Sequence, residues 1–243
     1  MMEEARSGPA NGRAFGEIAR VASALAHVLD GFDESAWIDA TLVPAEMRKL
    51  SVSPHFGRSI RAIATRAVTG ADFNVSATQF FALAADPRGR LALKLVSAPA
   101  EELEQVSLLV AAAILHRAIL HTTAKAERQR VRLALGPAAF MLATQEAPVL
   151  YAGLMTPDGD NLLLSILSAG ADEKDVQRGF VRFGLAALLR LTEAVAPGIE
   201  RLLERRLPPD LRPSLNGAPP ELDCSLFVKL IRRRMPSWSA TIG

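Results

Sequence analysis

The chain has 243 residues, of which 49% are hydrophobic and 5% aromatic, and it carries 28 basic against 26 acidic residues. This hydrophobic share is typical of globular proteins and excludes a disordered chain, and the near balance of charge gives no reason to expect a polyanion as partner. The single cysteine, Cys224, excludes an internal disulfide and fits a reducing cytosol.

The N-terminal residues divide into a tail, a helix and a loop. Residues 1–14 are polar and rich in small side chains, which predicts a flexible tail without a secretory signal. Apolar residues then recur at spacings of three and four over 15–29, the pattern of an amphipathic helix. Residues 32–43 lack such a period, so we expect an ordered loop around Trp37, followed by a short helix that begins at Pro44.

Three more helices are expected before residue 97. Ser53 and Pro54 suit the start of a helix that ends at Gly70. A second helix is predicted over 76–85 and is followed by a turn at 86–89. The run LALKLV over 91–96 suits a strand or a helix, and helix is favoured because no second strand candidate lies nearby. The buried side of the helix that starts at Ser53 is predicted to hold Phe56, Ile60, Ile63 and Val68, with Arg58, Arg61 and Arg66 nearer to water.

The stretch 99–121, PAEELEQVSLLVAAAILHRAILH, is predicted to form the central helix. Its start has a proline, which loses no hydrogen bond there, and three glutamates that suit the helix dipole. Every residue over 106–115 except Ser107 is apolar, which indicates a helix buried on most sides. The run is well short of the ~20 apolar residues of a membrane span. We therefore expect a cytosolic protein whose other helices pack around this one.

The remaining helices are separated by glycines and prolines. Thr122 or Thr123 is expected to cap the first of them and Gly136 to end it, and the next is expected to stop near Pro148. The predicted segments are helices over 122–136, 137–148, 161–170, 172–195 and 199–207, a proline-rich linker over 207–220, and a last helix over 223–234 that precedes Pro236 and Trp238.

The sequence thus predicts an all-α fold, an irregular bundle of about nine helices around the central helix. No boundary divides 15–243, so we expect a single helical domain in which the linker at 207–220 only detaches the last helix. No repeat of fixed period indicates a solenoid.

The sequence contains no motif for catalysis or metal binding. It has no nucleotide-binding glycine motif, no nucleophile elbow and no HExxH pair. His116 and His121 are five residues apart and so lie on different faces of a helix, which makes a poor metal pair. A partly buried thiol is favoured over a nucleophile for Cys224. We expect no catalytic residue, no metal, no cofactor and no small-molecule substrate.

Candidate partner-binding residues lie near the C-terminus. Interface hot spots favour Trp and Arg, and Trp238 follows the run Arg232, Arg233 and Arg234, while Trp37 is a weaker candidate. The competing interpretation places the tryptophans in the core and the arginines at the end of a helix, where cations suit the dipole.

The order of the segments resembles the type III secretion family SctK, called YscK in one member. The resemblance covers roughly residues 25–240 and rests on LALKLV, an acidic helix start, LLVAAAILHRAIL, and then RVRLALGPAAFMLATQEAPVL. Residues 35–38 before Val43-Pro44 are similar to the family's Ser-Trp-Leu-Pro region, and residues 235–238 to its closing Pro-x-Trp. Asp33 and Glu34 depart from the family's aromatic, proline-bearing lead-in.

The resemblance implies a non-enzymatic cytosolic adaptor in the sorting platform of the bacterial injectisome, at the cytosolic face of the inner membrane. Such an adaptor connects the SctQ pods, which lead through the stator SctL to the ATPase SctN, with the cytosolic domain of the inner-ring protein SctD. It implies no nucleic-acid partner and no insertion into the membrane.

Two other classes of function stay open from the residues alone. An all-α nucleic-acid-binding regulator would use Arg128, Arg130 and Arg132 or the terminal arginines, and its binding would fall steeply with salt. The near-neutral charge of the chain argues against it. An enzyme built on Cys224 is the third hypothesis, for which the sequence names no substrate.

Overall fold

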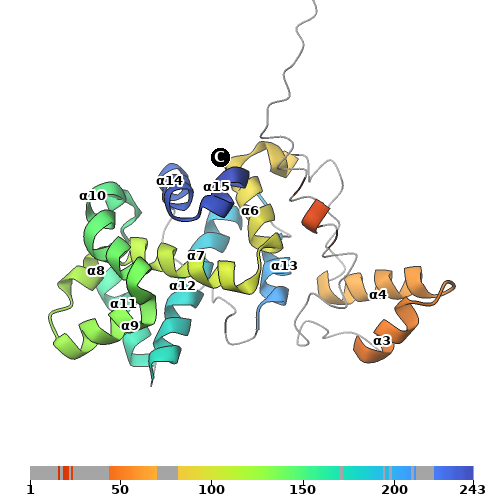
Figure 1. The fold of residues 1–243 in the computed structure, drawn as a ribbon, viewed down its shortest axis with the longest axis horizontal. Helices are drawn as coiled ribbons and strands as arrows, with labels where there is room; N and C mark the ends of the chain where they lie inside the picture. Colours follow the sequence, from red (N-terminus) through yellow and green to blue (C-terminus); the bar gives the residue numbers. More distant parts are fainter. Residues whose placement is uncertain are drawn as a thin grey trace, which may run out of the picture. The chain divides into compact units, whose positions relative to one another are not determined.

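Helices are the only regular secondary structure in the described part of the chain, where turns and loops join them (Figure 1). The structure is a computed structural model that describes residues 16, 19–21, 23, 44–69, 82–169, 172–193, 195–196, 199–208, 211 and 222–242. These ranges contain twelve α-helices and no strand, which confirms the all-α fold class and exceeds the expected count of about nine. The predicted tail, most of the helix at 15–29, the loop around Trp37, and most of the helix at 76–85 and of the linker at 207–220 lie outside the described residues.

The chain divides into two compact units. The first comprises Met1–Ala98, Thr192–Pro209 and Ser237–Gly243, and the second comprises Pro99–Leu191 and Asp210–Pro236. The last residues of the chain therefore belong to the first unit, although the helix before them belongs to the second. The single domain predicted over 15–243 stays a prediction.

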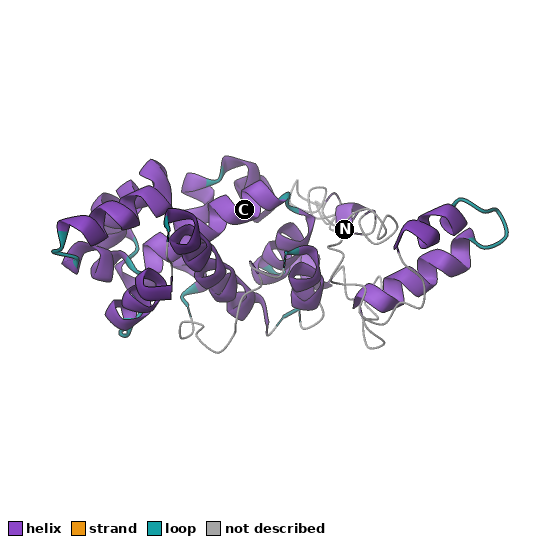
Figure 2. Ribbon diagram, turned by 90° about the horizontal axis from the view of Figure 1, so that it is seen from below, coloured by secondary structure: helices purple, strands orange, loops and turns teal. Residues whose placement is uncertain are grey.

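The described residues of the first unit form short helices, and Figure 2 shows the described parts of the chain as helices joined by loops. Within it α3 packs against α4, and both α4 and α6 pack against α13. On α4 the buried side is formed by Gly57, Ile60 and Ala64, so Ile60 was correctly predicted to be buried, whereas Phe56 and Ile63 are exposed. The helices of this unit are α3 (Pro44–Ser51), α4 (Gly57–Thr69), α6 (Pro87–Ser97), α13 (Ile199–Arg206) and α15 (Pro236–Ile242, of which Pro236 is counted with the second unit).

The start of α6 corrects one prediction and confirms another. Residues 86–89 do not form a separate turn, because Oδ1 of Asp86 accepts hydrogen bonds from the backbone N–H groups of Arg88 (2.6 Å) and Gly89 (3.1 Å) and caps the helix. Pro87 stands in the first turn, where its missing N–H is harmless. The run 91–96 is helical as predicted and wholly buried.

The second unit contains the predicted central helix. The shortest helix of this unit, α10, lies between a π-helical turn (Leu142–Glu146) and a 3₁₀ turn (Ala152–Leu154). Here α7 packs against α9 and the π-helical turn, and α8 packs against α11. The helices are α7 (Ala100–Ile114), α8 (His116–His121), α9 (Lys125–Met141), α10 (Ala147–Leu150), α11 (Gly159–Ala169), α12 (Glu173–Glu193, of which the last two residues are counted with the first unit) and α14 (Cys224–Arg234).

The central segment is buried as predicted, but it is two helices instead of one. Leu115, with φ −92° and ψ 9°, separates α7 from α8. The ring Nδ1 of His116 lies 2.8 Å from the carbonyl oxygen of Ala113. In an uninterrupted helix this oxygen would accept a hydrogen bond from a backbone N–H, so the ring competes with the helix for it. Residues 109–115 are all buried. Helix α12 packs closely against α7, because a Cβ on Gly184 of α12 would lie 2.0 Å from the Ser107 carbonyl oxygen.

The helix that follows is kinked where the sequence predicts a boundary. Gly136 has φ 72° and ψ 169°, and Pro137 starts the helical stretch after it. The stretch was predicted to stop near Pro148; Pro148 stands in the first turn of α10, which ends at Leu150. The prediction of a threonine cap is wrong: Ala124 is the cap residue, and the Thr122 hydroxyl donates instead to the Ala118 carbonyl oxygen at 3.0 Å.

One helical stretch of the described residues, Lys125–Leu150, is long and apolar enough to cross a membrane by length and composition alone. A single such stretch is weak evidence for a membrane protein, because core helices of soluble proteins meet the same criterion. The kink at Gly136 also divides it. A soluble protein is compatible with this finding, and the cytoplasmic location stays a prediction.

Candidate functional site

The arginines predicted to bind a partner form the end of α14. The helix begins at a strong cap, because Oδ1 of Asp223 accepts from the backbone N–H groups of Ser225 (2.8 Å) and Leu226 (3.3 Å). Hydrogen bonds from the Ser225 side chain and from these two N–H groups hold the pKa of Asp223 below its ordinary value. The buried residues of the helix are Phe227, Leu230 and Ile231, and its last turn holds Arg232, Arg233 and Arg234.

A glutamate from the π-helical turn binds two of these arginines. Nη2 of Arg234 donates a hydrogen bond to Oε1 of Glu146, and Nε of Arg233 lies 3.8 Å from Oε2 of the same carboxylate. The side chains of Glu146 and Arg234 are each 23% exposed, whereas that of Arg233 is 60% exposed. Among the residues that the structure describes, no carboxylate pairs with Arg232, which is exposed. Arg232 and Arg233 are therefore the two arginines available to a partner.

Tyr151 lies beside the same charges. Its side chain is buried, and burial raises the pKa of its hydroxyl, with smaller effects from the charges of Arg233, Glu146 and Arg234. Glu146 directly precedes the four residues of α10 and Tyr151 directly follows them. The end of α14 therefore lies next to α10.

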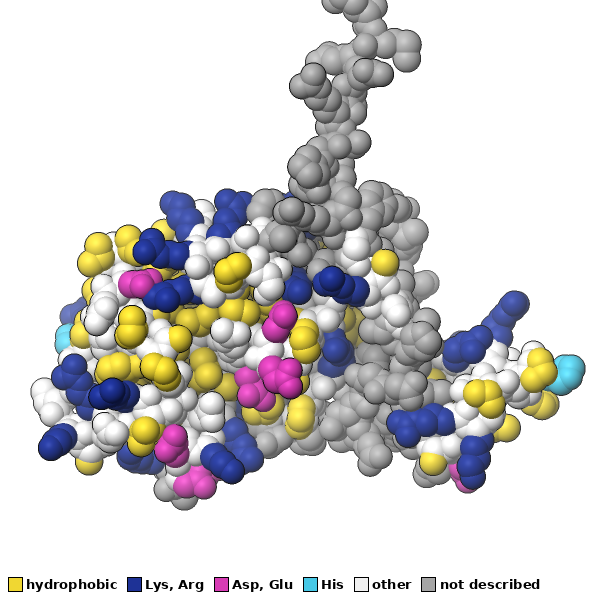
Figure 3. All heavy atoms as spheres, viewed as in Figure 1, with side chains coloured by type: hydrophobic (Ala, Val, Ile, Leu, Met, Phe, Trp, Pro, Cys, Tyr) yellow, Lys and Arg dark blue, Asp and Glu magenta, His cyan; other side chains and the backbone are white. Residues whose placement is uncertain are grey.

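The helix between these two residues exposes apolar side chains. Val149 is 79% exposed and Leu150 is 42% exposed. Together with Arg232 and Arg233 they form what we call the α10–α14 surface. In Figure 3 hydrophobic side chains gather over α10, with Lys and Arg side chains over α14 beside them. Exposed apolar groups next to arginines are the combination found at the centre of protein interfaces.

Trp238, predicted to accompany the arginines, does not contribute to this surface. Trp238 belongs to the first unit and is 0% exposed, so the prediction of an exposed anchor is wrong and the competing prediction of a core residue is confirmed. Nζ of the buried Lys94 lies 5.6 Å from the centroid of its ring. Trp37 lies outside the described residues.

The other charged candidates are separated from one another. In the second arginine cluster, Arg130 donates from Nη2 to the Leu167 carbonyl oxygen at 3.3 Å, while Arg128 and Arg132 are exposed. Nδ1 of the exposed His121 lies 3.8 Å from an oxygen of Asp160, and His116 is buried against Ala113 as described above. Cys224 is half-buried in the first turn of α14. Within the described residues no three His, Cys, Asp or Glu side chains form a group that could hold a metal ion.

Sequence reasoning found the arginines of the α10–α14 surface but missed Glu146, Val149 and Leu150. Glu146 and Arg234 are 88 positions apart, so no local pattern links them. The run Ala147–Leu150 looks like part of an apolar core, and sequence patterns do not reveal the π-helical turn that precedes it.

Comparison of the chain with protein-family models, with curated proteins and with solved structures gives no match.

Proposed function

We propose that this protein is a non-enzymatic cytosolic adaptor of the bacterial type III secretion injectisome, linking the SctQ pods of the sorting platform to the cytosolic domain of SctD. The observation that carries the proposal is the order of segments that resembles the SctK family over roughly residues 25–240. Through SctQ the adaptor would connect indirectly to SctL and the ATPase SctN.

The helical body supports this proposal. The segments that carry the resemblance, LALKLV and LLVAAAILHRAIL, fall in α6 and in the α7–α8 pair, and they are almost wholly buried. Close-packed helices change shape little, so they can hold surfaces at fixed positions within each unit. An adaptor needs such a body, because it acts by keeping its partners in place.

The α10–α14 surface gives the proposal a candidate contact. It offers two exposed apolar side chains, Val149 and Leu150, and two arginines, Arg232 and Arg233. The Glu146 carboxylate fixes the end of α14 against the turn that leads into α10, so the surface is ordered before a partner arrives. Which of SctQ and SctD it contacts is decided by experiment.

The direct test is co-expression of the chain with SctQ and with the SctD cytosolic domain, followed by affinity pull-down. We expect both partners to be retained at low and moderate salt. Failure to retain either one would overturn the adaptor function.

Matched variants locate the contact. Val149→Asp and Arg232→Glu should weaken the retention of one partner by about tenfold. Leu164→Asp on α11 and Arg132→Glu on α9 change other exposed residues of the same unit and should leave retention unchanged. If all four variants retain both partners, the contact lies elsewhere while the adaptor function stands.

A further inference from the structure

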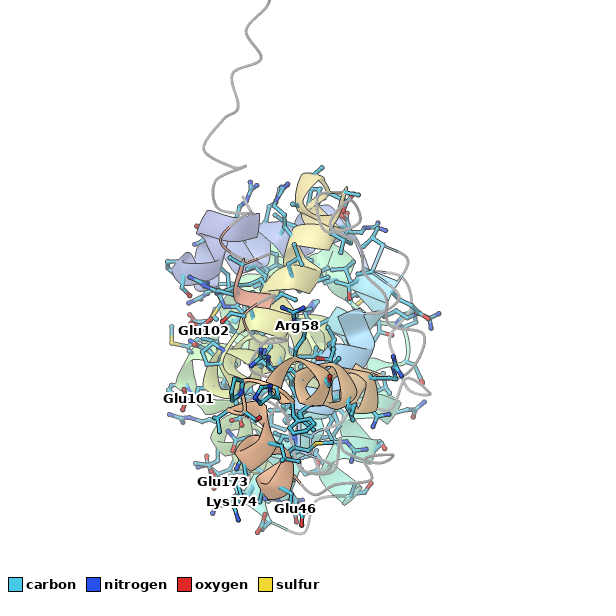
Figure 4. The ribbon with its side chains drawn as sticks, turned by 90° about the vertical axis from the view of Figure 1, so that its right-hand side faces the viewer. Glu46, Arg58, Glu101, Glu102, Glu173 and Lys174 are labelled. Carbon is cyan, nitrogen blue, oxygen red and sulfur yellow. The ribbon has the colours of Figure 1, made fainter. Side chains whose placement is uncertain are left out.

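The hairpin of α3 and α4, residues 44–69, concentrates positive charge. It holds five basic residues and one acidic residue, a net charge of +4 in a chain whose total is +2. In Figure 4, Arg58 on α4 and Glu46 near the start of α3 lie apart on the two helices. The five basic residues are Arg48, Lys49, Arg58, Arg61 and Arg66.

The tip of this hairpin exposes two apolar side chains, together with that of His55. Between the two helices Val52 is 82% exposed and Phe56 is 60% exposed. Phe56 was expected to be covered, since the periodicity placed it on the buried side of α4. That side is filled instead by Gly57, Ile60 and Ala64, and the aromatic ring is left in solvent.

The exposure does not come from a loose loop. The backbone N–H of Ser53 donates to the Leu50 carbonyl oxygen at 3.0 Å, and that of Gly57 donates to the Ser53 carbonyl oxygen at 2.8 Å. A Cβ on Gly57 would lie 2.4 Å from the Ser51 carbonyl oxygen, so the turn closes this tightly only with glycine. The tip is thus fixed with its two largest apolar side chains outward.

Cations surround the tip. Arg61 folds back toward it, with Nη1 3.7 Å from the place a Gly57 Cβ would take, while Lys49 and Arg58 lie in the adjoining helical turns. All three are exposed. Within the described ranges no carboxylate pairs with any of them. Their charges are therefore available to an anionic surface.

We propose that the tip of the α3–α4 hairpin binds the surface of an anionic phospholipid membrane. Val52 and Phe56 enter the boundary between headgroups and acyl chains, and Lys49, Arg58 and Arg61 meet lipid phosphates. The two exposed apolar side chains flanked by cations match a membrane surface, which has acyl chains beneath its phosphates. A protein partner at the tip is the alternative that the retention measurement below distinguishes. The contact is peripheral, crosses no bilayer and does not depend on the adaptor function.

Vesicle flotation of the full chain tests the proposal. The probes are vesicles of phosphatidylcholine mixed with phosphatidylglycerol, compared with vesicles of phosphatidylcholine alone. We expect the protein to float with the anionic vesicles, to remain free with the neutral ones, and to be released from the anionic vesicles as salt screens the charges.

Two paired variants separate the apolar and the charged contributions. Val52→Asp with Phe56→Asp, and Lys49→Glu with Arg61→Glu, should each lower the partition coefficient by about tenfold or more. The matched controls are Leu133→Asp with Leu164→Asp, and Arg128→Glu with Arg132→Glu, which change exposed residues of the second unit and should bind as the wild type does. Circular dichroism and thermal unfolding verify that every variant is folded.

Three results would overturn the proposal. The first is no flotation with anionic vesicles, or equal flotation with neutral ones. The second is wild-type binding by both hairpin variants, or equal loss in the controls. The third is that the wild-type chain binds no vesicles while the hairpin variants lose the retention of SctQ or SctD. This result would identify the tip as a protein contact.

Discussion

Trp238 is the largest fully buried side chain in the described part of the chain, and the ammonium group of Lys94 lies over its ring. Trp238→Ala removes this volume from a close-packed interior, so we expect the free energy of unfolding to fall by about 3–5 kcal/mol in urea denaturation. Trp238→Phe keeps most of the apolar volume and should cost less.

Partner binding measured on the same Trp238 variants distinguishes core from interface. A folded Trp238→Ala protein with unchanged stability and lost retention of SctQ or SctD would contradict the core assignment.

The cap of α14 predicts a dependence of stability on pH. The pKa of Asp223 is lowered in the folded protein, chiefly by hydrogen bonding to Ser225. A lowered pKa means that the charged cap stabilises the fold above the unfolded pKa, and that this contribution is lost as the pH falls through the folded pKa. Asp223→Asn keeps a capping side chain without the charge, so thermal unfolding should show wild type and variant converging in the acid range. A constant difference in melting temperature at all pH values would contradict this.

At the scale of elements, the packing of α12 on α7 depends on the absence of a side chain at Gly184. A Cβ there would lie 2.0 Å from the Ser107 carbonyl oxygen, a backbone atom that cannot move alone. Gly184→Ala should therefore lower the free energy of unfolding by about 1–3 kcal/mol or more. The control is Gly179→Ala on the same helix, where the new Cβ would meet Cγ2 of Ile166 at 2.9 Å, and this side chain can shift. Chemical denaturation in which Gly179→Ala costs as much as Gly184→Ala would show that the close approach is not the cause.

Helices with strong local signals could be predicted from the sequence. Gly136 followed by Pro137 marks a real boundary, because its φ of 72° suits glycine. Sequence signals failed to predict helix boundaries in two situations. At the end of α7 the His116 side chain competes with the backbone, and at the start of α6 Asp86, predicted as part of a turn, caps the helix. The π-helical turn at Leu142–Glu146 has no sequence signature.

At the scale of the whole molecule, the same reasoning found part of the candidate site. Arg232 and Arg233 could be predicted from residue type and position, since arginines ending a helix face solvent unless something covers them. Their neighbours Val149 and Leu150 could not, because the contact between α14 and the turn before α10 joins segments 88 positions apart through Glu146. The two compact units were also not predicted, since each contains segments distant in sequence.

The adaptor function requires that the chain hold two partners at once. The most direct measurement immobilises the SctD cytosolic domain and quantifies the SctQ recovered with and without this protein. We predict that SctQ is recovered only when the chain is present and in proportion to it. Recovery of SctQ without the chain, or none when the chain is bound to SctD, would contradict the proposed function.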